Sequence, residues 1–178
     1  GCLSFNGNKI VTTGGGGAIL TNDTKLADFA RHLTSTAKQT HLWEYVHDFV
    51  GYNYRMPNLN AALGCGQLEK IEKFLTNKRE LYFRYAEAFK NVEGVRLVEE
   101  PPQCRSNYWL HCLILDEAVS DQRNAVLELT NNEGIMTRPA WNLLHTLKPY
   151  KNYPRTSTSV AKRLMKCLIS LPSSPCLI

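Results

Sequence analysis

The sequence lacks the long apolar runs, the dense charge and the cysteine spacing that mark several protein classes. No apolar run approaches the ~20 residues that a helix needs to cross a bilayer, so we expect no membrane-spanning segment. The chain opens on Gly1 without a basic stretch followed by an apolar one, which predicts no secretory signal and a cytoplasmic location. A start without Met also suggests a fragment of a longer protein.

Charge of one sign is not in large excess. The chain has 21 Lys and Arg against 16 Asp and Glu, a net charge of +5 with His neutral. Nucleic-acid binding needs a denser basic surface than these scattered residues offer, so we expect neither a nucleic acid nor a membrane as partner. Hydrophobic residues at 43% and charged residues at 21% are ordinary values for a folded protein, and they exclude intrinsic disorder.

The cysteines do not have the spacing of a metal site. No two of them stand in a C-x-x-C pair, and the adjacent His111 and Cys112 have no second cluster that would complete a zinc site. We therefore expect no metal, and reduced thiols at all six positions. These are Cys2, Cys65, Cys104, Cys112, Cys167 and Cys176.

Apolar spacing and turn residues predict an α/β chain in two parts, divided at Pro101–Pro102. In residues 1–100 the strands are expected at 1–5, 10–13 and 18–21, the helices at 23–33, 57–75 and 77–90, and an irregular aromatic segment at 41–55. One part of the second helix should be slim enough for close packing, because small residues gather there. They are Ala61, Ala62, Gly64 and Gly66.

Residues 101–178 are expected to form a small α+β unit. Its strands are predicted at 108–115 and 135–137, its helices at 119–132 and 157–168, and an aromatic-rich loop at 139–154.

The densest chemical signal is the segment from Ser4 through Lys9 to the four glycines Gly14–Gly17. The glycines follow the lysine, so the segment is not a phosphate loop, and it also fails the G-x-G-x-x-G dinucleotide pattern. A lysine amine can form a Schiff base with the aldehyde of pyridoxal phosphate (PLP), and a hydroxyl such as that of Ser4 can bind the phosphate. Glycines would let the backbone run close to a planar ring. A solvated lysine in a surface turn is the alternative reading.

Two blocks of sequence together resemble one family. Ser4–Gly17 is similar to the cofactor-lysine segment of the DegT/StrS-type nucleotide-sugar aminotransferases, and Gly51–Glu69 is similar to that family's G-[YF]-N-[YF]-R-[ML] segment and the helix after it. The resemblance runs to Leu171–Ser174. It implies the aspartate-aminotransferase-like fold (PLP fold type I), here its C-terminal portion: the end of the large domain in residues 1–100 and the small α+β domain in 101–178.

The resemblance also implies roles for individual residues. Lys9 matches the lysine that bonds to PLP and moves the proton between substrate and cofactor, and Ser4 matches a phosphate-binding hydroxyl. Asn53 matches the asparagine that reaches the phosphate of the neighbouring subunit's cofactor, which implies a homodimer with shared active sites.

Substrate contacts are less sharply indicated. Arg55 could bind a substrate phosphate, or it could hold its loop through an ion pair with Asp48. His47 is expected at an interface or against the substrate, and His145 resembles a family position near the sugar site. The aromatic residues Trp43, Tyr45 and Trp109 are expected to pack rather than to stack on a ligand.

Within the family the motifs look most like the LegC-like branch. This implies transfer of an amino group from glutamate to C4 of a UDP-linked 4-keto-6-deoxy sugar, on the way to legionaminic acid or related cell-surface polysaccharide sugars. A GDP-perosamine synthase and a non-catalytic relative of the fold are the alternatives. The family's partners of the cofactor ring precede the lysine and cannot be assigned here, so we expect these 178 residues alone to be inactive.

Overall fold

The computed structural model describes residues 1–174, so the predicted thiol at Cys176 lies outside the described residues. The chain divides into two compact units, Gly1–Glu72 and the residues from Lys73 onward. The sequence placed its boundary after residue 100 instead. The units divide earlier because Lys78 bonds to Ser173, and because β3 (Val95–Leu97) pairs with β4 (His111–Leu115). Both contacts join residues before Pro101 to the second unit.

The first unit begins with a hairpin and a capped helix. Strands β1 (Cys2–Ser4) and β2 (Gly17–Ile19) pair in antiparallel fashion, and α1 (Thr24–Thr34) follows them. The Asp23 carboxylate accepts the N–H of Leu26 at 3.1 Å, which confirms the predicted helix cap. The predicted strand at 10–13 is wrong. Thr13 bonds through its N–H to the carbonyl of Phe5 within the hairpin loop, so this segment takes no part in a sheet ladder.

The helices after residue 57 break at a different place from the predicted one. The structure has α2 (Asn58–Leu68) and α3 (Ile71–Phe89), whereas the sequence predicted helices at 57–75 and 77–90. The chain turns at Glu69 and Lys70, where the N–H of Lys70 bonds to Gln67 three residues earlier, at 3.1 Å. The apolar stripe continues across this turn, so periodicity alone did not reveal the break.

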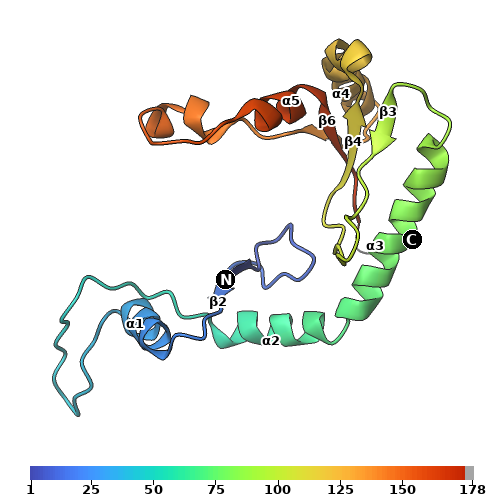
Figure 1. Cartoon of the computed structure of the whole chain (residues 1–178). Helices are drawn as coiled ribbons and strands as arrows, with labels where there is room; N and C mark the ends of the chain where they lie inside the picture. Colours follow the sequence, from blue (N-terminus) through green and yellow to red (C-terminus); the bar gives the residue numbers. More distant parts are fainter. Residues whose placement is uncertain (175–178) are drawn as a thin grey trace. The chain divides into compact units, whose positions relative to one another are not determined.

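The second unit is built on a four-stranded antiparallel sheet in the order β3-β4-β6-β5 (Figure 1). Strand β6 (Leu168–Leu171) was missed by the sequence analysis, which gave Leu168 to the preceding helix. No Gly or Pro separates the two elements, and a short apolar run fits a strand and a helix equally well. Strand β5 (Arg138–Pro139) lies just after the predicted 135–137.

The core of this unit lies between the sheet and its helices. Leu115, Cys167 and Ile169 form its buried centre, and Val126 of α4 packs against them. The helices are η1 (Glu117–Gln122), α4 (Arg123–Asn132) and α5 (Ser159–Cys167), and the aromatic-rich loop holds the 3₁₀ turns η2 (Leu144–Thr146) and η3 (Lys148–Tyr150). The predicted helix at 119–132 therefore begins as a 3₁₀ turn.

An ion pair fixes the loop between β3 and β4. Both oxygens of Glu100 accept from the guanidinium of Arg79 at 2.8 Å, and Glu100 also accepts the N–H of Ser106 at 2.6 Å. These bonds, with the Arg79 bond the largest cause, lower the pKa of Glu100 to about 2. The start of the loop that contains Pro101 and Pro102 is therefore held in place by the bonds of Glu100.

Two further observations concern residues 1–174. Among them, no helix combines the length and apolar character that a bilayer crossing requires. The five cysteines in this range are free thiols.

Truncation of the central core residue should be costly. Ile169 is 1% exposed, so Ile169→Ala removes buried methyl groups and should lower the free energy of unfolding by about 2–5 kcal/mol. Denaturant unfolding measures the change. The control is Val160→Ala on α5, where the side chain is 60% exposed and the change should stay within about 0.5 kcal/mol. Equal losses in both variants would contradict this placement of the core.

Candidate active site

Lys9 lies in the loop of the β1–β2 hairpin. The N–H of Phe5 bonds to Gly16 and that of Thr13 bonds to Phe5, each at 3.0 Å, which closes the base of the loop. Inside the loop, the N–H of Lys9 bonds to Asn6 at 3.0 Å and forms a tight turn. The half-buried Lys9 side chain therefore starts from a backbone that is held on both sides.

Ser4 belongs to the same hairpin, as the last residue of β1. Its exposed hydroxyl oxygen accepts the N–H of Asn6 at 3.4 Å, which leaves the hydroxyl hydrogen available to a ligand. The strand thus brings an amine and a hydroxyl into one short segment.

Contacts and backbone angles within the chain explain the run of glycines at 14–17. A Cβ at Gly17 would overlap the carbonyl oxygen of Leu3 on the paired strand, and Gly14 and Gly16 have φ of 78° and 110°. Gly15 alone has open space around it. The sequence analysis linked these glycines to a planar ring, whereas hairpin pairing and left-handed turns already require three of the four.

Helix α2 holds the loop from the other side. The amide of Asn60 donates to the carbonyl of Thr13 at 2.6 Å, and Thr13 is 2% exposed. A Cβ at Gly64 would lie 2.9 Å from the methyl group of Thr13, so the predicted slim face is confirmed at this position. Gly66 has no neighbour within 4 Å, so close packing does not extend to it.

Asn53 lies at the end of an arm that leaves and rejoins α1, drawn in Figure 1 as the long loop beyond that helix. Ser35 and Asn53 form an antiparallel bridge, and the N–H of Tyr54 bonds to Thr34 at 2.9 Å. Asn53 is exposed. Its position is therefore fixed by backbone pairing, while the residue stays exposed.

Asp48 is paired with a different residue from the one the sequence offered. Its carboxylate lies 2.5 Å from Nε2 of His32, and this bond lowers the pKa of Asp48. Within residues 1–174 no ion pair joins Arg55 to Asp48, so that alternative for Arg55 is wrong. His47 donates from Nδ1 to the carbonyl of Thr36 at 2.7 Å, across the arm.

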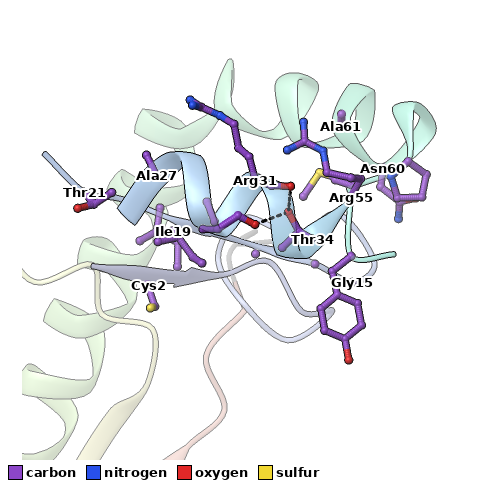
Figure 2. Close-up of a pocket in the computed structure, with 18 residues that line it drawn as sticks. Cys2, Gly15, Ile19, Thr21, Ala27, Arg31, Thr34, Arg55, Asn60 and Ala61 are labelled. Carbon is purple, nitrogen blue, oxygen red and sulfur yellow. Dashed lines mark hydrogen bonds between the residues drawn. The ribbon is translucent and has the colours of Figure 1, made fainter. Parts of the chain in front are cut away.

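A hollow of about 970 Å³ lies between the hairpin, α1 and the segment before α2 (Figure 2). Arg55 lines it, whereas Ser4, Lys9 and Asn53 do not. Arg31 of α1 also lines it, and its guanidinium pairs with Asp28 at 2.9 Å. A guanidinium group such as that of Arg55 suits an anion.

The remaining predicted residues lie elsewhere. His145 is half-buried in η2 of the second unit. Trp43 and Tyr45 are 71% and 78% exposed. The Trp43 ring meets that of His41 edge-on at 4.9 Å, and Nζ of Lys38 lies 3.8 Å from the centre of the Tyr45 ring. Their expected role in packing rather than in ligand stacking stays a prediction. Residues 1–174 contain no group of three or more His, Cys, Asp or Glu that could hold a metal.

Arg31 and Asn60 were missed as site residues. Asn60 stands in the second sequence block, where its place beside the quoted motif was a usable signal. Arg31 had no such signal, because one basic residue in the last turn of an amphipathic helix is ordinary.

Substitutions in the glycine run should separate close packing from open space. Gly17→Ala should destabilise the first unit by about 1–3 kcal/mol, because the new methyl group meets backbone that cannot move without loss of strand pairing. Gly15→Ala is the matched control and should change stability by less than about 1 kcal/mol. Thermal unfolding measures both, and a larger loss at Gly15 would overturn this account of the loop.

Known proteins resemble this chain in sequence and in fold. The sequence model of the DegT/DnrJ/EryC1/StrS aminotransferase family matches residues 1–178. EpsN of Bacillus subtilis (strain 168), assigned as a pyridoxal phosphate-dependent aminotransferase, is 38% identical over 177 residues, which is 97% of this chain and 45% of EpsN. The GDP-perosamine synthase of Escherichia coli O157:H7 is 34% identical and covers 98% of this chain and 46% of its own length.

Solved structures agree with the sequence relatives. The aminotransferase TlmJ from Streptoalloteichus hindustanus superposes with a TM-score of 0.90 at 27% identity, over 100% of this chain and 47% of TlmJ. The chain therefore spans about half the length of the relatives it matches. The expected aspartate-aminotransferase-like fold is confirmed, and the chain belongs to the DegT/DnrJ/EryC1/StrS aminotransferase family.

Proposed function

We propose that the protein containing this chain is a PLP-dependent aminotransferase that acts on a nucleotide-linked keto sugar. The observation that carries the proposal is Lys9, held at the turn of a pinned hairpin loop with Ser4 on the same hairpin. Family membership and the PLP-dependent assignment of EpsN support it. Because the chain spans about half of its relatives, the activity is proposed for a protein that also supplies the partners of the cofactor ring.

The residues present fit PLP by their chemistry. Lys9 offers a primary amine for the aldehyde, and the Ser4 hydroxyl, with its hydrogen available, can donate to the phosphate. When bound, PLP supplies an aldehyde and an electron-withdrawing ring that stabilises negative charge on the substrate carbon.

Each residue has a proposed task in the reaction. Lys9 holds the cofactor and then carries a proton to and from the reacting carbon as a general acid and base. Ser4 fixes the phosphate end. Asn53, exposed on its arm, donates its amide to the phosphate held by a second copy of the chain, so the active form is a homodimer with shared sites.

The substrate's phosphates are proposed to bind Arg55, whose alternative partner Asp48 is taken by His32. Arg31 lines the same hollow, with its guanidinium paired with Asp28. His47 and His145 are proposed as further substrate contacts, with the Nδ1 bond of His47 fixing its ring and leaving Nε2 as an acceptor.

The LegC-like motifs support a UDP-linked 4-keto-6-deoxy sugar as the proposed substrate. Glutamate is the proposed amino donor and C4 of the sugar is the acceptor carbon. The proposed products are legionaminic acid-type sugars, made in the cytoplasm. A GDP-linked keto sugar is the second candidate. It is favoured by identity, since three GDP-perosamine synthases are 31–34% identical, whereas the transaminase from Helicobacter pylori with a UDP-linked product is 23% identical.

Reductive trapping tests the cofactor assignment. Borohydride reduction of the purified protein saturated with PLP, followed by peptide mass spectrometry, should place a pyridoxyl group on Lys9. Lys9→Ala should lose this adduct. Lys25→Ala, at an exposed lysine of α1, should keep it. A folded, PLP-saturated protein with unmodified Lys9 would replace the aminotransferase proposal with a non-catalytic relative of the fold.

Kinetics on the two candidate nucleotide sugars test the role of Arg55. Loss of a charged hydrogen bond to a phosphate corresponds to roughly 10–100-fold in affinity. Arg55→Gln should therefore raise KM for the nucleotide sugar by about that factor and leave KM for glutamate unchanged. Arg84→Gln on the exposed side of α3 is the control. A parallel rise in both KM values would remove Arg55 from the phosphate site.

A further inference from the structure

His111 is a buried histidine without a hydrogen-bond partner. It lies on β4 and is 1% exposed. Neither Nδ1 nor Nε2 has a partner among the described residues. A buried imidazole normally has at least one nitrogen in a hydrogen bond. The His111 ring instead packs as an aromatic group, and its free nitrogen can still bind a proton.

Aromatic rings surround it on several sides. Tyr108 stacks on His111 with ring centroids 5.6 Å apart, Tyr85 meets it edge-on at 5.5 Å, and Tyr82 lies at 6.3 Å. Burial raises the pKa of all three tyrosines, so they are neutral near pH 7. Strand β6 places Leu171 opposite His111. The groups packed around the ring therefore provide no negative charge.

The charged group beside His111 is the ammonium group of Lys78. Lys78 of α3 is 2% exposed, and its Nζ donates to the carbonyl of Trp109 at 3.2 Å and to Ser173 Oγ at 2.7 Å, with a third bond to the carbonyl of Ser173. Three acceptors match the three hydrogens of an ammonium group. Burial lowers the pKa of Lys78 to about 8, so it keeps its charge at neutral pH.

These two facts determine the response of His111 to acid. Burial is the larger cause and the Lys78 charge the smaller one in lowering the pKa of His111 to about 4 from an ordinary 6.5. A base whose pKa falls on folding contributes stability above its unfolded pKa, and that stability is lost as the pH falls from about 6.5 towards about 4.

The segment Pro172–Ser174 is the part best placed to respond. It follows Leu171, the residue paired with His111. Side chains of α3 hold it: Tyr85 donates its hydroxyl to the carbonyl of Pro172 at 2.9 Å, and Lys78 holds Ser173. These bonds lie outside the sheet ladder, so the segment can detach while the strands stay paired.

We propose that His111 is a proton sensor that controls the attachment of Pro172–Ser174 to α3. Protonation places a second cation beside the Lys78 ammonium with no acceptor for either imidazole N–H. Release of the segment lets water reach both groups and relieves the repulsion. His111 and Pro172–Ser174 both belong to the second unit, and this proposal does not depend on the aminotransferase proposal.

An NMR titration of the histidine ring protons in the intact chain tests the sensor directly. The His111 resonance should titrate with a pKa of about 4, well below the ordinary value of 6.5. Lys78→Gln should raise the pKa of His111, because it removes the neighbouring charge, whereas a purely structural lysine would leave that pKa in place. A His111 resonance that titrates at the ordinary value of 6.5 overturns the proposal.

Unfolding and hydrogen exchange test the consequence. Between pH 7.5 and pH 5 the wild-type midpoint should fall further than that of His111→Phe, while His41→Gln should follow the wild type. At pH 5 the peptide that contains Pro172–Ser174 should exchange faster in the wild type than in His111→Phe. Equal exchange in the two proteins would overturn release of the segment. If His111→Phe does not fold, His111→Gln takes its place in the same exchange comparison, and equal exchange in that variant and in the wild type overturns the proposal.

Discussion

The hydrogen bond from the Asn60 amide to the Thr13 carbonyl joins the two sequence blocks on which the candidate site depends. One block contributes the lysine loop and the other contributes the helix that supports it. Gly64 permits the close approach, because any larger residue would meet the methyl group of buried Thr13. Asn60 and Thr13 are 47 positions apart in the sequence, so the position of Lys9 depends on a helix to which it does not belong.

Sequence reasoning succeeded where local chemistry decides the structure. Neighbouring residues are enough to identify the Asp23 cap, the irregular aromatic segment and the lysine motif. It failed where distant contacts decide. Strand β6 exists because Ile169 pairs opposite Leu113, and the break at Glu69–Lys70 interrupts no apolar stripe. The pairing of Asp48 with His32 joins residues 16 positions apart, a distance over which sequence spacing carries no geometric information.

The two units use charge in opposite ways. In the first unit, Arg31 and Arg55 line an open hollow, and the exposed guanidinium of Arg31 pairs with Asp28 on the same helix. In the second unit, the ammonium of Lys78 is buried and satisfied by oxygens of the chain itself. Exposed cations suit recognition, because they can exchange water for a ligand. A buried cation organises the backbone around it, and it makes any further charge nearby unfavourable.

The bonds between Lys78 and Ser173 join residues 95 positions apart, and this has a consequence for the order of folding. A contact of such long sequence separation carries a large loop-closure entropy, so it forms after the local elements. During synthesis α3 emerges long before its acceptor exists, and Lys78 must stay hydrated until the last residues of the unit arrive. The contact between Lys78 and Ser173 therefore forms late, after the strands that precede Ser173 have been made.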